Sequence, residues 1–349
     1  MRIKLLDSYR GIAILMVIFF HFFSRWVKVY PYGSDYNFFE FGKLGVQFFF
    51  MISGFVILNS LEKTTSILFF LKKRMIRLLP SMLIASILTY IFLINFDDKN
   101  LFPSGHYIKN LLISLTFIEP DLISSLIGRR INFDYLSSVY WSLWPEVQFY
   151  LFVSTIFFVF RKNFYLVFFV LALIISLVKI SMDYLVFSEG SFLYIMKNIF
   201  RVFNLSLTLP FFCIGIYFYI LYTIQVKALR VKRITHIFFS MFVLIQVYYY
   251  WGDFVKLSFY FVFLSLFFLM IFKKRYLLYL ENKLFIKLGV SSYFLYLIHE
   301  SIGVVLIEKF ARNNFPFFSI LLIIILCAIS ILYTYYFEIR IAKYLKNHF

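Results

Sequence analysis

The stretch LDSYRGIAILMVIFFHF, residues 6–22, is a helix-length apolar run interrupted by Asp7, Arg10 and His21. A secretory signal peptide has an unbroken apolar centre followed by a cleavage site of small residues, and neither feature is present here. We therefore expect this run to be retained as the first transmembrane helix. Similar apolar runs follow along the rest of the chain. The fold class indicated by this first run is therefore a protein with several transmembrane helices.

The composition of the whole chain is that of an integral membrane protein. Of its 349 residues, 62% are hydrophobic and 15% are charged, with a mean hydropathy of +0.86. A soluble domain has about half apolar and about a quarter charged residues. The same figures exclude a disordered chain and a collagen-like fibre. We predict an all-α integral membrane protein, with residues 1–349 forming a single membrane-embedded domain.

The apolar runs predict about ten transmembrane helices, each of about 17 to 25 residues, the length that crosses a bilayer. They lie at 8–25, 44–60, 78–95, 139–160, 164–181, 203–225, 234–251, 255–272, 288–308 and 316–338. The run 107–118 is shorter and Pro120 follows it, so we expect an interfacial or re-entrant segment there.

The basic residues predict the orientation of these helices. The net charge of +18 would suggest a nucleic-acid partner if one face collected it, but Lys and Arg fall in short clusters between the apolar runs. With ten spans, most clusters lie on the side of the N-terminus, which the positive-inside rule assigns to the cytoplasm. We expect both termini in the cytoplasm, an amphipathic cytoplasmic segment at 62–79, a long extracytoplasmic loop at 96–138, and no nucleic-acid partner.

The two cysteines offer no covalent or metal chemistry. Cys213 and Cys327 both lie in apolar runs and form no CxxC pair. A disulfide framework, a metal site and a permanently bound cofactor are therefore not expected.

A few ionisable residues stand inside the apolar runs, where they are costly and usually mark function. His21 follows Arg10 by eleven residues, about three helical turns or about 16 Å, so both side chains share one helix face at different depths. Glu146 lies in the fourth span, and His299 with Glu300 lies near the middle of the ninth. We expect these residues to meet His21 in a central cavity.

A structural interpretation stays open for each of these residues. Arg10 could anchor the helix at the cytoplasmic surface, while His21, Glu146 and His299 could hydrogen-bond between helices. Arg74 and Arg77, three residues apart on the amphipathic segment, could bind lipid headgroups or clamp a phosphorylated ligand.

Five stretches in the order LDSYRGIAILMVIFFHF (6–22), GVQFFFMISGFVI (45–57), RMIRLLP (74–80), YWSLWPEVQFYLF (140–152) and SSYFLYLIHE (291–300) resemble acyltransferase family 3 of membrane proteins. The family signature is an Arg, ten residues and a His, which Arg10 and His21 match. The sequence departs from the usual pattern at Ser8-Tyr9, at Val147 and at Glu338-Ile339-Arg340, where a proline is common. Because little sequence follows the last span, we expect the stand-alone form without a fused SGNH esterase domain.

The resemblance implies acyl transfer, most often of acetyl, from cytoplasmic acyl-CoA to a hydroxyl of a glycan or lipid-linked saccharide outside the bacterial inner membrane. It implies His21 as general base, because imidazole titrates near neutral pH, with Glu146 orienting it and Arg10 in the catalytic set. A covalent acyl-histidine stays open.

The same layout places the two substrates at opposite ends of the membrane. Arg10, Arg74 and Arg77 would bind the phosphates of acyl-CoA, since guanidinium pairs with phosphate oxygens. Trp141 and His299, with the outer loop around Asp97, Asp98 and Tyr135, would receive the acceptor. Membrane lipid is the remaining partner.

Two rival classes fit a chain with ten spans. A transporter or flippase of lipid-linked glycans usually shows paired halves with matching broken helices, but Pro80, Pro145 and Pro210 do not pair across the two halves. A membrane glycosyltransferase would favour an acidic cluster at a helix end, for which Asp97-Asp98 is the one candidate.

Overall fold

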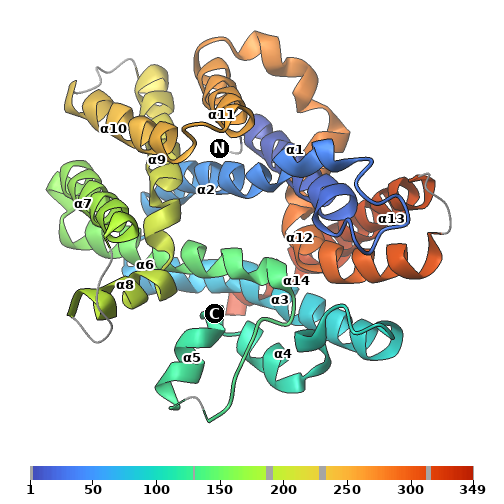
Figure 1. The fold of residues 1–349 in the computed structure, drawn as a ribbon. Helices are drawn as coiled ribbons and strands as arrows, with labels where there is room; N and C mark the ends of the chain where they lie inside the picture. Colours follow the sequence, from blue (N-terminus) through green and yellow to red (C-terminus); the bar gives the residue numbers. More distant parts are fainter. Residues whose placement is uncertain (1–2, 129, 186–191, 228–232, 312–315, 349) are drawn as a thin grey trace. The chain divides into compact units, whose positions relative to one another are not determined.

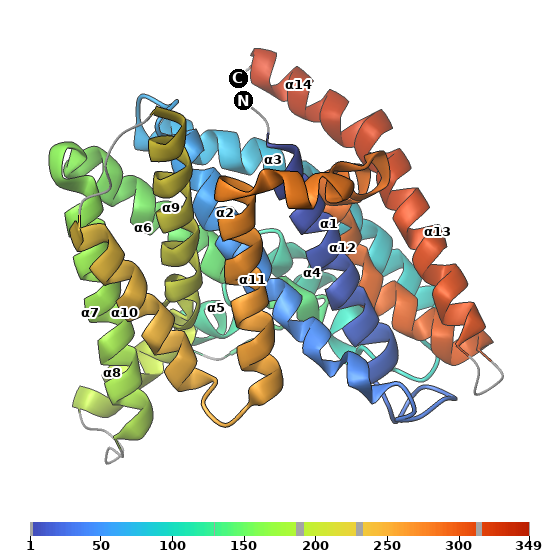
Figure 2. The same ribbon diagram turned by 90° about the horizontal axis from the view of Figure 1, so that it is seen from above.

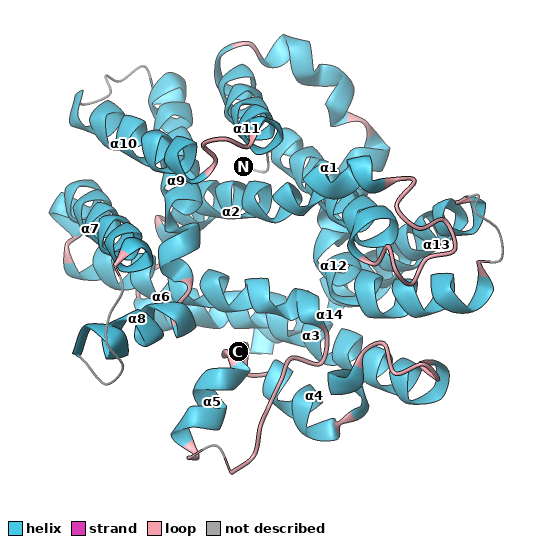
Figure 3. Cartoon of the chain, viewed as in Figure 1, coloured by secondary structure: helices cyan, strands magenta, loops and turns pink. Residues whose placement is uncertain are grey.

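The computed structural model describes residues 3–128, 130–185, 192–227, 233–311 and 316–348, and every regular element in these ranges is helical (Figure 3). Within these ranges, nine helical segments are long and apolar enough to cross a membrane. They are Lys4–Arg25, Asn37–Leu61, Ile67–Phe96, Ser138–Val159, Arg161–Tyr184, Leu205–Val226, Phe254–Phe272, Lys283–Phe310 and Phe317–His348. The predicted all-α, multi-pass membrane fold is confirmed.

The remaining expected span, 234–251, corresponds to the apolar helix α10 (Arg233–Tyr249), which has 17 residues. At 1.5 Å per residue it is about 26 Å long, slightly shorter than the hydrocarbon core of about 30 Å. The expected short segment at 107–118 contains α4 (Ile108–Ser114), whose 7 residues are too few to cross.

The amphipathic cytoplasmic segment expected at 62–79 runs without a break into the span expected at 78–95, and its cytoplasmic position stays a prediction. Residues Ile67–Phe96 form one helix of 30 residues, α3, with Pro80 inside it. A proline removes one backbone hydrogen bond, and membrane helices tolerate this where neighbouring helices or hydroxyl side chains satisfy the freed carbonyl. Lys72, Lys73, Arg74 and Arg77 lie in the first turns of α3, whereas Lys63 precedes it.

The chain divides into two compact units (Figure 1). The first unit comprises Met1–Val46, Lys73–Ser142 and Leu277–Phe349, and the second comprises Gln47–Lys72 and Leu143–Tyr276. The single domain 1–349 expected from the sequence stays a prediction.

The first unit holds most of the candidate site. Its helices are α1 (Lys4–Phe20), α3 from Lys73 onward, α4, α5 (Pro120–Leu126), α12 (Lys283–Phe310), α13 (Phe317–Tyr333) and α14 (Ile339–His348). A π-helical turn at His21–Arg25 continues α1. A second π-helical turn, Thr334–Glu338, joins α13 to α14. Short 3-10 turns occupy Asn37–Leu44, Pro103–His106 and Ser138–Ser142.

Helices α1 and α12 run parallel and pack backbone against backbone. A Cβ atom added at Gly289 of α12 would lie 1.6 Å from the carbonyl oxygen of Asp7, so only glycine allows this approach. Further along both helices, the ring of Phe22 fills the space that a side chain at Gly303 would need. The two glycines thus fix the register of α12 against α1.

One end of the first unit collects basic residues. The Ser8 hydroxyl donates to the Leu280 carbonyl over 2.7 Å, which places the starts of α1 and α12 together, and Arg77 interacts electrostatically with Glu338 beside α14. Figure 2 shows α14 at the same end as the start of α1. The cations on these helix segments include Lys4, Arg10, Lys73, Arg74, Arg77, Lys283, Lys287, Arg340, Lys343 and Lys346. This grouping is the one that cytoplasmic termini predict, and the orientation itself stays a prediction.

The second unit is built around α9 (Leu205–Lys227). Its other helices are α2 (Gly45–Leu61) from Gln47 onward, α6 (Leu143–Val159), α7 (Phe164–Tyr184), α8 (Phe192–Val202), α10 and α11 (Phe254–Phe272). A Cβ atom at Gly54 of α2 would lie 2.2 Å from the Phe212 carbonyl oxygen of α9, so these helices also touch through backbone. The short helix α8 was not expected from the sequence.

We expect Gly289→Ala to lower the melting temperature of the detergent-solubilised protein by several degrees. The added methyl group collides with backbone of α1, and overpacking of this kind costs about 1–3 kcal/mol. Ala328→Val adds volume at an exposed position of α13 and serves as the control. Equal melting temperatures for Gly289→Ala and the control would contradict the close α1–α12 contact.

Candidate active site

His21 occupies the first position of the π-helical turn that ends α1. A π-helical turn shifts the backbone hydrogen bonds by one residue, and such turns occur frequently at functional sites. The hydroxyl of Tyr30 donates to the His21 carbonyl, and that of Tyr32 donates to the Phe22 carbonyl. The segment that follows α1 therefore folds back and holds the turn that carries His21.

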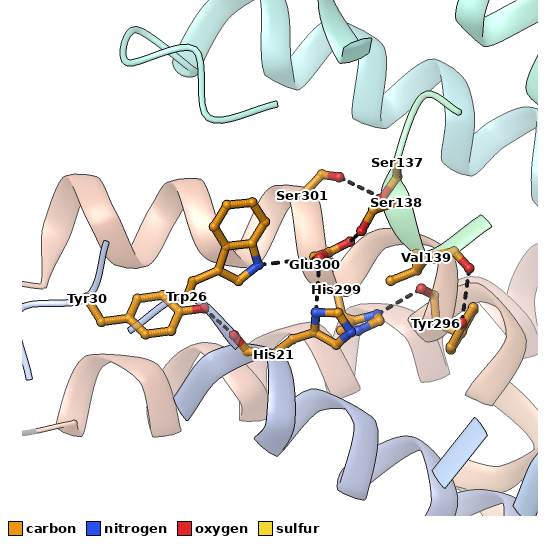
Figure 4. Close-up of polar contacts among 10 residues, drawn as sticks. All are labelled: His21, Trp26, Tyr30, Ser137, Ser138, Val139, Tyr296, His299, Glu300 and Ser301. Atoms are coloured by element: carbon orange, nitrogen blue, oxygen red, sulfur yellow. Dashed lines mark hydrogen bonds and ion pairs between the residues drawn. The ribbon is translucent and has the colours of Figure 1, made fainter. Parts of the chain in front are cut away.

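The His21 side chain lies beside a buried carboxylate of α12. Its Nδ1 atom is 3.1 Å from Oε1 of Glu300, which is fully buried (Figure 4). A carboxylate only accepts hydrogen bonds, so in neutral His21 the proton belongs on Nδ1 and the lone pair on Nε2. This is the arrangement in which a carboxylate orients an imidazole that acts as base.

Glu300 also receives hydrogen bonds from two other segments. The indole Nε1 of Trp26 donates to Oε1 over 3.3 Å, and the Ser138 hydroxyl donates to Oε2. Trp26 in turn contacts the ring of Phe102, with 5.0 Å between ring centroids. The carboxylate thus has a partner on each oxygen, which offsets part of the cost of burying its charge.

His299 contacts His21 edge to face, with ring centroids 5.0 Å apart and an interplanar angle of 79°. Its Nδ1 atom lies 2.8 Å from the carbonyl oxygen of Tyr296. The side chain is fully buried, and its Nε2 atom has no hydrogen-bond partner among the described residues. The structure thus brings together His21 and His299, as the sequence predicted.

The 3-10 turn that precedes α6 is held against α12 by hydroxyl contacts. Tyr296 donates to the Val139 carbonyl over 3.0 Å, and Ser301 donates to Ser137 over 2.8 Å (Figure 4). Tyr296 also contacts the Ser142 hydroxyl at 2.8 Å. Trp141, in the same turn, is 39% exposed. The site is therefore assembled from the end of α1, the middle of α12 and residues 137–142.

The three predicted phosphate-binding arginines lie at the basic end of the first unit. Arg10 forms an ion pair with Asp7 over 3.6 Å, Arg74 is buried, and Arg77 is exposed and interacts with Glu338. Their predicted role in binding acyl-CoA stays a prediction.

Glu146 belongs to the second unit, on α6. Its Oε1 atom accepts hydrogen bonds from the hydroxyls of Ser53, over 2.9 Å, and Tyr150, over 2.5 Å. Glu146 is the carboxylate expected to orient His21, whereas the carboxylate that lies at His21 Nδ1 is that of Glu300. The only sequence signal for Glu300 was its position beside His299 in the motif 291–300.

The segment 97–137 of the first unit is a folded element with acidic residues. Asp97 accepts from the backbone N–H groups of Leu101 and Phe102 and contacts His106 Nε2 at 3.1 Å, so it holds the turn that follows α3.

Tyr135, in the same segment, donates to Glu119 over 2.9 Å. Burial raises the pKa of the Glu119 carboxyl and of the Tyr135 hydroxyl. Asp98 forms an ion pair with Lys309 over 2.7 Å.

The described residues contain no group of three or more His, Cys, Asp or Glu side chains that could hold a metal ion. The two cysteines stand apart, and Cys213 is buried. The ionisable groups that the structure brings together in the first unit are His21, His299 and Glu300.

The described helices thus include nine that are long and apolar enough to cross a membrane, and the first unit holds a buried histidine paired with a carboxylate. A family model described as an acyltransferase domain, acyltransferase family 3, matches residues 3–338. The chain belongs to this family of acyltransferases, as its motifs indicated.

A relative described as an O-acetyl transferase, from Shigella phage Sf6, is 32% identical over 132 residues. The match covers 36% of this chain and 39% of the relative. The chain thus matches well under half the length of that relative. No solved structure matches the chain.

We expect Glu300→Gln to lower the transfer rate about 100-fold or more, because the amide neither stabilises a protonated His21 nor enforces its tautomer. The neutral isostere keeps the volume and the hydrogen-bonding shape, so expression and melting temperature are expected to change little. Glu308→Gln, on the same helix, is the control. A wild-type transfer rate for Glu300→Gln would contradict the expectation that the Glu300 carboxylate supports His21 in the reaction.

Proposed function

We propose that the protein transfers an acyl group, most simply acetyl, from cytoplasmic acyl-CoA to a hydroxyl of a cell-surface glycan or lipid-linked saccharide. The observation that carries the proposal is the 3.1 Å contact between His21 Nδ1 and the buried Glu300 carboxylate. Family membership supports acyl transfer, and the name of the phage relative supports an oxygen acceptor and acetyl.

The proposed chemistry follows from the lone pair on His21 Nε2. A sugar hydroxyl is not nucleophilic at neutral pH, so Nε2 removes its proton while the oxygen attacks the thioester carbonyl. Glu300 stabilises the imidazolium that forms. When the carbon–sulfur bond breaks, the same Nε2–H protonates the departing thiolate of CoA, and His21 returns to its neutral form.

The proposed layout places the donor at the basic end of the first unit. His21 lies about 16 Å along α1 from Arg10, a distance that an extended pantetheine arm spans. Arg10, Arg74 and Arg77 would hold the phosphates of acyl-CoA, while Trp141 and residues of 97–137 would face the acceptor. We place the protein in the bacterial inner membrane, with this basic end in the cytoplasm.

Glu146, on α6 of the second unit, is a further proposed catalytic residue. Its carboxylate is already engaged by Ser53 and Tyr150, so its contribution is through a hydrogen-bonded network rather than through a free charge. Glu146→Gln, which removes the charge of the carboxylate, is the variant that tests this contribution.

His21→Ala is expected to abolish the transfer of labelled acetyl from acetyl-CoA into envelope glycan by membranes that contain the protein. Without Nε2 the hydroxyl keeps its proton, and general-base catalysis contributes about 10²–10⁴-fold. His236→Ala, in the second unit, is the control. Labelled product from the His21 variant at the wild-type rate would exclude His21 as base.

The same assay tests the function as a whole. Label that stays on the wild-type protein in the absence of acceptor, and moves to glycan on its addition, would show a covalent acyl-histidine instead of direct transfer. Absence of label from wild-type product would overturn acyl transfer, and glycan translocation would then be measured.

Arg74→Gln is expected to raise the KM for acetyl-CoA about tenfold with a smaller effect on kcat, because hydrogen bonds to a charged group contribute about 1.5–3 kcal/mol. Lys63→Gln removes an exposed cation from the sequence before α3 and controls for general lipid attraction. If both variants show the wild-type KM, Arg74 does not bind the donor.

A further inference from the structure

His299 presents a buried nitrogen that the proposed acyl-transfer mechanism does not use. Its Nδ1 atom lies 2.8 Å from a backbone carbonyl, which can only accept a hydrogen bond, so in the neutral ring the proton sits on Nδ1. Nε2 then carries a lone pair. It is fully buried and has no donor among the described residues. A buried acceptor without a donor costs about 1–3 kcal/mol, so a ligand hydroxyl that donates to Nε2 would gain the binding energy of a buried hydrogen bond.

The two histidines have different supports and therefore different capacities. Glu300 lies at Nδ1 of His21 and stabilises the ring when Nε2 takes a proton. Only a neutral carbonyl lies at Nδ1 of His299. His21 is thus suited to remove a proton, whereas His299 is suited to accept a hydrogen bond without removing the proton.

The geometry of the two histidines indicates which group donates a hydrogen bond to His299 Nε2. The ring centroids are 5.0 Å apart, so the two imidazoles lie at one small region of the site. Neighbouring hydroxyls of a sugar ring stand on adjacent carbons, so one sugar can present two O–H donors to such a region. One hydroxyl would give its proton to His21, and the next would donate a hydrogen bond to His299.

The position of His299 along α12 favours the acceptor over the acyl donor as its partner. His299 lies 16 residues, about 24 Å, beyond Lys283 at the basic end, and 11 residues, about 16 Å, before the end of α12 at Phe310. The pair is also tied through Glu300 to Ser138 and Trp26, which belong to the end away from those cations.

We propose that His299 Nε2 binds a second hydroxyl of the acyl acceptor, next to the one that is acylated, and thereby selects acceptors with neighbouring hydroxyl groups. This inference rests on the proposed acyl transfer and names its substrate class. A site built to accept a hydrogen bond from a substrate hydroxyl discriminates strongly against acceptors without it, because its own polar atom is then left unpaired.

The first test compares the steady-state kinetics of wild type, His299→Gln and His299→Phe, with His236→Phe as control. The donor is labelled acetyl-CoA, and the acceptor is a dilution series of the envelope glycan fraction from the source cells. We expect His299→Phe to lower kcat/KM for the glycan about 100-fold, to leave the KM for acetyl-CoA within about twofold of wild type, and to keep the pH profile. His299→Gln, whose amide oxygen can accept a hydrogen bond, should recover part of the loss.

The unchanged KM for acetyl-CoA also shows that a His299 variant is folded, because a collapsed site would lose both substrates. A raised KM for acetyl-CoA with unchanged use of glycan would assign Nε2 to an amide N–H of the donor and overturn the proposal. A shifted pH profile would make His299 a proton carrier and would also overturn it, as would wild-type kinetics in every variant.

The second test locates the new ester in the wild-type product by NMR. The proposal requires a free hydroxyl on a carbon next to the acylated one. An ester whose neighbouring carbons are all deoxygenated or glycosidically linked would overturn the proposal while leaving acyl transfer established, so the two failures are distinguishable.

Discussion

A carboxylate inside a membrane protein has to be compensated by the protein itself, and in the first unit this requirement falls on Glu300. Removing an ion from water costs several kcal/mol, which only close donors or cations offset. His21, Trp26 and Ser138 supply them from the end of α1, from the segment after it and from the turn before α6. These three segments therefore meet at one buried side chain, whose hydrogen-bonding shape holds them together.

This constraint works only if α1 and α12 keep one register. A helix turns by about 100° per residue, so a shift by a single position would turn Glu300 away from His21. The backbone contact at Gly289 and the ring of Phe22 against Gly303 prevent such a shift. The tyrosines after α1 hold the other partner, because Tyr30 and Tyr32 bind the carbonyls of the π-helical turn. Packing and chemistry are thus specified by the same pair of helices.

Hydropathy predicted most of the fold, because the length of a membrane helix is set by the bilayer. Hydropathy could not predict where α3 begins. A basic amphipathic stretch followed by Pro80 and an apolar span gives the same hydropathy pattern whether the two parts form separate segments or one long helix. The spacing of Arg10 and His21 and the motif around His299 pointed to two histidines that the structure brings into contact. The partner of His21 escaped prediction, because choosing Glu300 over Glu146 requires the relative register of helices nearly three hundred residues apart.

The distance in sequence between the partners has a consequence for biosynthesis. Among the crossing segments of the described residues, His21 lies on Lys4–Arg25 and Glu300 on Lys283–Phe310, with six others between them. A chain that enters the membrane as it is made would therefore hold the His21 imidazole without its carboxylate partner until residue 300 has been synthesised. A chain that stops before α12 would lack this ion pair.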